Sequence, residues 1–183
     1  MPPDVLVRTV SEEVLQIARQ SRGTGAPEEA RVARLIEDKI APHFDFARIT
    51  RLAVGQPWRQ ATDTQRERLT TAFRGMLIRT YAAAYRGYRE VAMDVRPVAL
   101  TPGDTDALVR TSLKLPENPT PLAIDYSMHR TPDGWKVYDV AVAGASLVTT
   151  YRSGFGEQIR AHGLDGLIAD LEARATGAKP ARR

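Results

Sequence analysis

Residues 134–155, GWKVYDVAVAGASLVTTYRSGF, are the stretch that decides how the second half of the chain folds. Large apolar side chains fill both alternating sets of positions, with Trp135 and Val137 in one set and Tyr138, Val140 and Val142 in the other. A regular strand sends alternate side chains to opposite faces, so the pattern predicts a strand with apolar surface on both sides. A small domain must cover that surface with its core or offer it to a ligand.

The segments that precede this stretch alternate with the same period of two. Residues 91–100, 106–115, 121–130 and 134–143 read as strands, and the turn sequences TPGDT, PENPT and TPDG separate them. Short connections between four successive strands predict a four-stranded antiparallel meander over residues 91–143.

One face of the predicted sheet is apolar. It is expected to carry Val109, Thr111 and Leu113 from the second strand, and Ile124, Tyr126 and Met128 from the third. If Leu115 faces Leu122, Asp125 lies diagonally between Arg110 and Lys114 on the polar face.

Helical periodicity fills most of the chain outside the sheet. Apolar residues spaced by three and four predict helices, and glycine or proline ends several of them. The predicted helices are residues 5–20, 27–40, 45–52, 62–88, 149–161 and 164–175. Five or six helices that cover a sheet with one apolar face make an α+β fold.

The clearest helix start is ATDTQ, where Thr62 and Gln65 have the spacing of a capping box. The helix that follows is amphipathic and rich in aromatic residues. Its apolar face carries Leu69, Phe73, Met76, Leu77, Tyr81, Ala84 and Tyr88, and Tyr85 lies nearby. Its opposite face carries Arg68, Arg79 and Arg86, which are candidates for docking a partner.

Composition describes an ordinary globular protein of 183 residues, with 43% hydrophobic and 26% charged residues. No run approaches the roughly 18 apolar residues of a membrane helix. The chain lacks cysteine, which excludes disulfides and thiolate chemistry, and MPPDVLVRTV lacks the pattern of an export leader. A net charge of +4 favours acidic partners without choosing among them.

Signals for catalysis are weak. The histidines His43, His129 and His162 lack metal-ligand spacing, and GASLV lacks the closing glycine of a nucleophile elbow. Neither a catalytic nor a metal site is therefore expected. Asp139 is the one acid of interest: it is either a general base in an apolar cavity, or a carboxylate satisfied by backbone N–H groups or by an arginine such as Arg152.

Two longer segments contain specific sequence motifs. Residues 44–85 contain FDF, RLAVGQPWR and FRGMLIRTY, and residues 124–155 contain WKVYDVAVAGASLVTTYRSGF. In content, order and spacing these pieces resemble the MlaC family, also called the toluene-tolerance or ABC-transporter auxiliary family. With the strands between them, they extend the resemblance over most of residues 27–171.

The resemblance implies a periplasmic phospholipid carrier that is not an enzyme. It would shuttle phospholipid, as cargo and without a cofactor, between an outer-membrane lipoprotein and porin complex and an inner-membrane ABC transporter complex with its periplasmic lipid-binding subunit. We expect a monomer that does not bind nucleic acid. Residues 1–175 would form one lipid-binding domain, and residues 176–183 a basic disordered tail.

A carrier of this family would hold acyl chains in a cavity between the sheet and the helices. The side chains expected to line it share an inward position on their helix or strand. They are Met76, Leu77, Tyr81, Val109, Thr111, Leu113, Ile124, Tyr126, Met128, Leu147 and Tyr151. For each of them ordinary core packing is the alternative. For the whole chain, the alternative function is a small-molecule enzyme with Asp139 as general base.

Overall fold

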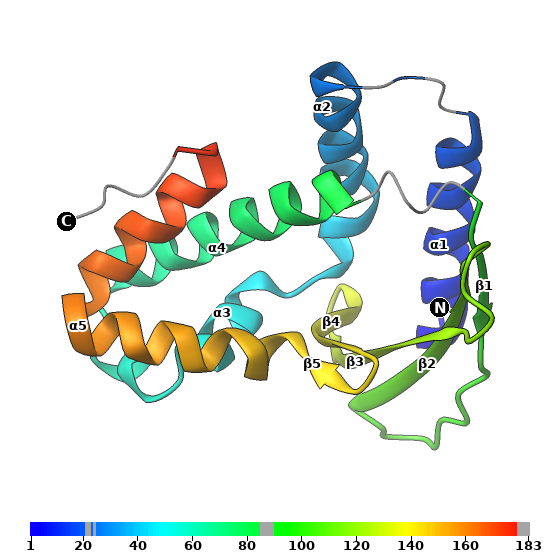
Figure 1. Cartoon of the computed structure of the whole chain (residues 1–183). Coiled ribbons are helices and arrows are strands. Elements are labelled where there is room, and N and C mark those ends of the chain that lie inside the picture. The colour runs from blue at the N-terminus through cyan, green and yellow to red at the C-terminus, as the bar shows by residue number, and fades with distance from the viewer. Residues whose placement is uncertain (21–22, 24, 85–89, 179–183) are drawn as a thin grey trace. The chain divides into compact units, whose positions relative to one another are not determined.

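The computed structural model describes residues 1–20, 23, 25–84 and 90–178 (Figure 1). The chain forms two compact units, and each is built from two separate segments. Unit 1 consists of Met1–Asp45 and Ala82–Leu147, and unit 2 of Phe46–Tyr81 and Val148–Arg183. The single domain expected over residues 1–175 stays a prediction, because neither unit by itself tests it.

Unit 1 begins with helix α1 (Pro3–Gln20), which lies along β1 and β2 in Figure 1. Its buried residues include Val7, Val14 and Ala18, whose spacing of seven and four keeps them on one side of the helix. Two arginines also attach α1 to the chain around β1: Arg8 donates to the carbonyl of Val95 over 2.9 Å, and Arg19 to that of Val91 over 3.1 Å.

The second predicted helix is present with a change of pitch near its end. Helix α2 (Ala26–Leu35) continues into the π-helical turn η1 (Ile36–Ile40) and the 3₁₀ turn η2 (Ala41–His43). Phe44 then forms a parallel bridge with Val137, and the backbone N–H of Asp45 donates to the carbonyl of Val137 over 2.8 Å. The first chain segment of unit 1 thus ends against the sheet.

The sheet is antiparallel, with the strand order β1-β2-β3-β4-β5 of a meander. Its strands are β1 (Ala92–Val95), β2 (Asp106–Lys114), β3 (Leu122–Thr131), β4 (Gly134–Val142) and β5 (Ala145–Ser146). The α+β class and the meander are confirmed, but four strands was wrong. The two-residue strand β5 follows a tight turn in which Ala143 and Gly144 both have positive φ, of 50° and 82°, as expected for a hairpin of this length.

The expected pairing of β2 with β3 was wrong by two residues. Leu122 pairs with Leu113 instead of Leu115, so Arg110 lies directly opposite Asp125. A shift of two residues leaves every side chain on its expected face, because side chains alternate with a period of two. The face assignments from the sequence therefore survive the change in register.

A β-bulge resolves the apolar pattern on both sides of β4. Met128 pairs with Val137, whereas its neighbour Ser127 pairs with Asp139, so Tyr138 is the extra residue on β4. A bulge reverses the alternation of the strand beyond it. Trp135 and Val137 before the bulge, and Val140 and Val142 after it, consequently lie on the same face. Of the five apolar residues expected on two faces, only Tyr138 lies on the other one, where its ring packs against His129.

Unit 2 begins with helix α3 (Phe46–Val54), the 3₁₀ turn η3 (Gln56–Gln60) and helix α4 (Asp63–Ala84). The predicted capping box is confirmed: the N–H of Gln65 donates to Thr62 Oγ1 over 3.1 Å, and the N–H of Thr62 donates to Gln65 Oε1 over 2.9 Å. The predicted end of this helix at Tyr88, together with Tyr85 and Arg86, lies outside the described residues.

The last helix of the chain, α5 (Leu147–Thr176), changes direction at Gly163. This glycine has φ 71° and ψ −179°, a conformation that separates the two helices predicted on either side of it. Beyond this kink the helix comes close to α4, because a Cβ added to Gly75 would lie 3.0 Å from the Cβ of Ala175. The tail was expected over residues 176–183, but Thr176 is the last residue of α5, and residues 179–183 lie outside the described residues.

Candidate functional site

The predicted lining residues divide between the two units. Unit 1 holds Leu147 and the six from the sheet, which share one face of β2 and β3: Val109, Thr111, Leu113, Ile124, Tyr126 and Met128. Unit 2 holds Met76, Leu77, Tyr81 and Tyr151. The structure brings the six sheet residues together as predicted, and a cavity lined by both groups stays a prediction.

One end of this apolar face is packed core. Val109 and Met128 are fully buried, and they cluster with Trp135 and Val137 of β4 and with Val7 of α1. We call Val109, Met128, Trp135 and Val137 the closed end of the face. For Val109 and Met128 the alternative of ordinary core packing is thus the one that the structure supports.

The other end of the same face keeps partial exposure. Leu122 and Ile124 of β3 and Val140 of β4 are partly buried, and Val142 is 37% exposed. We call these four residues the open end of the face; Val140, like Tyr126, also packs against the core cluster of the closed end. Ile124 pairs directly with Val142, so their side chains lie next to each other.

Only Ile124 of the open end was among the predicted lining residues. Val140 and Val142 were missed because the bulge at Tyr138 was not expected, and without it they would face the other way. The sequence did contain a signal for the bulge, because the apolar alternation changes at Tyr138 and Asp139. Such a change fits a bulge as well as it fits a strand with two apolar faces.

On β2, Thr111 and Leu113 lie directly opposite Ile124 and Leu122 of the open end, and both are buried. The hydroxyl of Thr111 donates to the carbonyl of Ile124 over 2.7 Å, which satisfies the polar group in place. Leu147 is partly buried and directly follows β5.

Tyr126 marks the boundary between the closed and open ends. Its side chain is partly buried and packs against the core cluster of unit 1. Burial raises the pKa of Tyr126 to about 12, because the phenolate would lose its hydration in this position. Its hydroxyl is therefore neutral at any physiological pH.

The predicted residues of unit 2 belong to a helical core. Met76 and Leu77 are buried, whereas Tyr81 is 46% exposed. The ring of Tyr151 lies edge-on to Phe73 with centroids 5.1 Å apart, and burial raises the pKa of Tyr151. Phe155 completes this aromatic cluster, at 5.0 Å from Phe73.

Asp139, the candidate general base, is held by neighbouring groups of unit 1. Its Oδ1 accepts from the backbone N–H of Val140 over 2.9 Å, and its Oδ2 accepts from the hydroxyl of Ser146 over 2.5 Å. Arg152, suggested as its partner, donates two hydrogen bonds to the carbonyl of Leu52. The carboxylate thus links β4 to β5. This structural role agrees with one of the alternatives from the sequence, a carboxylate that accepts hydrogen bonds from backbone N–H groups.

A second polar group also lies on the polar face of the sheet, opposite the apolar face. His129 Nε2 is 2.9 Å from Asp45 Oδ2, and the His129 ring lies edge-on to Tyr138 at 5.7 Å. Nearby, burial and the charge of Lys136 lower the pKa of His43. Within residues 1–20, 23, 25–84 and 90–178, no group of three or more His, Asp or Glu side chains is arranged to hold a metal ion.

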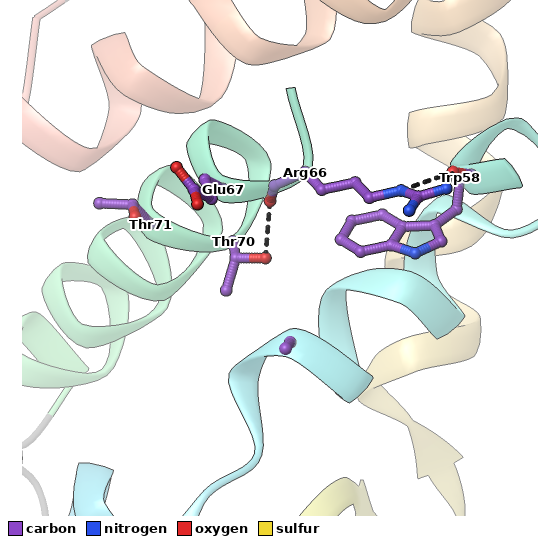
Figure 2. A pocket seen from close by; sticks show the side chains of 6 residues that line it. Trp58, Arg66, Glu67, Thr70 and Thr71 are labelled. Atoms are coloured by element: carbon purple, nitrogen blue, oxygen red, sulfur yellow. Dashed lines mark hydrogen bonds between the residues drawn. The ribbon is translucent and has the colours of Figure 1, made fainter. Parts of the chain in front are cut away.

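Unit 2 contains a pocket of about 400 Å³ between α3, η3 and the start of α4 (Figure 2). It is lined by Ala47, Trp58, Arg66, Glu67, Thr70 and Thr71. A neighbouring pocket of about 550 Å³ lies between α4 and the end of α5, and Glu67 and Thr71 line both. Neither pocket includes a predicted lining residue. Sequence reasoning missed both because each is formed by separate elements, α3, η3 and α4 in the first and α4 with the end of α5 in the second.

The arginines predicted to dock a partner have different environments. Arg68 forms two hydrogen bonds of 2.9 Å with the carboxylate of Glu172. Arg79 is exposed, and Arg86 lies outside the described residues. The predicted stripe is therefore divided, since its first member already has an acidic partner on α5. None of the helices in the described part of the chain is long and apolar enough to cross a membrane.

Comparison with known proteins gives matches that extend over most of both units. The model of the family described as MlaC protein matches residues 8–173. Among solved structures, the phospholipid-binding protein from Ralstonia solanacearum, determined in complex with a phospholipid, is 33% identical to this chain. The match has a TM-score of 0.84 and covers 97% of this chain and 98% of that one.

Proposed function

Because the chain belongs to the MlaC family, we propose that it is a phospholipid carrier of the periplasm that moves lipid between complexes of the outer and inner membranes. The outer-membrane complex would contain a lipoprotein and a porin. The inner-membrane complex would be an ABC transporter with a periplasmic lipid-binding subunit. In this proposal phospholipid is cargo, and the chain works as a monomer and not as an enzyme.

The observation that carries the proposal is the match to the Ralstonia solanacearum protein. That protein was determined with a phospholipid bound, and the match extends over nearly the whole length of both chains at 33% identity. Similarity of this extent supports the same fold and the same class of ligand for this chain.

The open end of the sheet is the part of unit 1 that suits an acyl chain. Ile124, Val140 and Val142 present a strip of branched aliphatic side chains that is not fully covered. Burial of such apolar surface stabilises a complex by about 25 cal/mol for each Å² removed from water. Met76, Leu77, Tyr81 and Tyr151 of unit 2 stay in the proposal as further lining residues.

The energetics of the cargo require a partner for release. Two acyl chains of about 16 carbons, at roughly 0.8 kcal/mol for each buried methylene, represent on the order of 25 kcal/mol. This exceeds the practical ceiling for noncovalent affinity, so part of the energy must offset the ordering of the chains. Release into water would still be slow, and we expect efficient transfer only when the carrier is docked on a membrane complex.

The proposal is tested by purification followed by native mass spectrometry and lipid extraction. We expect the chain to carry a phospholipid, or to take up a fluorescent phospholipid from vesicles when it arrives empty. Asp139→Asn should take up the same lipid within about twofold, because the carboxylate has a structural role. A chain that neither carries nor takes up phospholipid would contradict the proposal.

A further inference from the structure

The distribution of charge separates a strongly basic segment from the rest of the chain. Phe46–Tyr81, the first segment of unit 2, contains seven arginines and two acidic residues, Asp63 and Glu67. The two segments of unit 1 together contain 13 basic and 16 acidic residues. A potential of this sign attracts acidic groups of a partner and raises the rate of encounter.

The basic segment also contains the pocket at Trp58. Arg66 donates to the carbonyl of Trp58 over 3.0 and 3.2 Å, and its guanidinium carbon lies 5.6 Å from the centre of the indole (Figure 2). The hydrogen bonds hold the guanidinium against the backbone of Trp58, and the indole itself is partly buried. Tryptophan and arginine are the side chains most enriched at the energetic centres of protein interfaces.

Two exposed arginines lie beside this pocket. Arg51 follows Ala47, a lining residue, by four positions on α3, so the two share a side of the helix. Arg59 directly follows Trp58 in η3. Both side chains are exposed. The pocket is therefore lined by an aromatic ring, and two exposed arginines are close neighbours in the chain of its lining residues Ala47 and Trp58.

From this combination we infer that the Trp58 pocket docks an acidic segment of a partner protein, which inserts one apolar side chain beside the indole and places carboxylates against Arg51 and Arg59. The inference rests on the proposed function, in which the partners are the two membrane complexes. The pocket has room for a side chain beside Glu67 and Thr71, whereas a bilayer surface has no side chain to insert.

The test compares charge reversal at the pocket with the same change elsewhere. Arg51→Glu with Arg59→Glu is measured against Arg96→Glu with Arg160→Glu, two exposed arginines outside the pocket, so that the change in net charge is equal. The probes are the purified inner-membrane transporter complex and the purified outer-membrane complex, each immobilised. We expect the pocket variant to bind one of them at least about tenfold more weakly, and the control variant to lose less than about threefold.

A second variant tests the pocket itself without changing charge. Ala47→Met should partly fill the pocket and weaken the same interaction by about tenfold, since the inserted side chain loses its space. Equal losses in the pocket and control variants, or normal binding by Ala47→Met, would overturn the inference. Loss of binding to phosphatidylglycerol vesicles with unchanged binding to both complexes would also overturn it, because the surface would then face a membrane.

The phospholipid content of all these variants is measured in parallel by native mass spectrometry. We expect it to be unchanged, because none of the residues that line the pocket is among the proposed lipid-lining residues. Normal lipid content with weakened docking supports the inference. A wild-type chain without lipid that still docks through the pocket would contradict the proposed cargo and leave the docking result standing.

Discussion

The closed and open ends of the sheet's apolar face are built from similar side chains and differ in what covers them. At the closed end Val109 and Met128 pack with Val7 of α1 and have no exposure. At the open end Ile124 and Val142 are neighbours on the same face, yet Val142 is 37% exposed. One face is thus fully buried at one end and partly exposed at the other.

The difference teaches that sequence pattern assigns a side chain to a face but does not show whether the face is covered. The bulge at Tyr138 keeps the apolar residues of β4 on one face along the length of the strand. Without it, Val140 and Val142 would lie with the polar residues. The predictions below test this comparison, from the largest expected effect to the smallest.

A charge at the closed end should unfold the protein, whereas a charge at the open end should not. Val109→Asp places a carboxylate among fully buried side chains, and we expect it to reduce the free energy of unfolding by about 4 to 5 kcal/mol. Ile124→Asp, at a partly buried position, should cost less than half of that. Urea unfolding followed by circular dichroism measures both, and equal losses would remove the distinction between the two ends.

Truncation of uncharged side chains should show the same order with smaller values. Met128→Ala leaves a cavity in the closed end and should cost about 2 to 5 kcal/mol. Val142→Ala removes methyl groups that water already reaches, so we expect less than about 1 kcal/mol. Thermal unfolding of the empty protein provides the comparison, and a larger loss for Val142→Ala would show that the open end is packed.

Stability at alkaline pH should report the burial of Tyr126 at the boundary. The pKa of its hydroxyl is about 12 in the folded chain and 10.0 as the ordinary value, so the unfolded chain loses this proton first as the pH rises. Its contribution is complete below pH 10 and is lost between pH 10 and 12. The total is about 3 kcal/mol, at 1.36 kcal/mol for each pH unit.

Tyr126→Phe removes the ionisable group and serves as the control for this effect. We expect the difference in unfolding free energy between wild type and variant to decline as the pH rises from 10 to 12. A difference that stays constant over this range would show that the hydroxyl is hydrated and that the boundary lies elsewhere.

Deletion of Tyr138 should produce only a small change, because the remaining sequence alternates regularly. The deletion converts WKVYDVAV into WKVDVAV, in which Trp135, Val137, Val140 and Val142 all fall on one face of a regular strand. We expect the chain to fold with a loss of about 1 to 2 kcal/mol, which reflects the lost contact with His129 and the altered bend. Nuclear Overhauser effects between Ile124 and Val142 should persist, and their loss would contradict the face assignment.

The sequence was sufficient to predict the helices, the meander and the capping box at Thr62, because these depend on local periodicity and on neighbours in the chain. It was insufficient for β5, since a strand of two residues has no pattern of its own. The sequence also could not predict which residue of β2 pairs with Leu122, because a shift of two residues keeps the same alternation.

For the candidate site, the sequence assigned Ile124 and Tyr126 to the same face of the sheet but could not separate covered from uncovered positions. Coverage depends on which helix packs on each end, as α1 does on Val109. The pocket at Trp58 was missed for a related reason, because Ala47, Trp58 and Thr70 approach one another only in the folded unit.

The most direct test of the account compares phospholipid binding by Val142→Asp and Leu108→Asp. The two residues have similar exposure, 37% and 41%, but lie on opposite faces of the sheet, since Val142 pairs with Ile124 and Leu108 with Ser127. Native mass spectrometry and uptake of fluorescent phospholipid from vesicles give the readout. The account predicts that Val142→Asp loses most of its lipid while Leu108→Asp retains it, and equal retention by the two variants would contradict it.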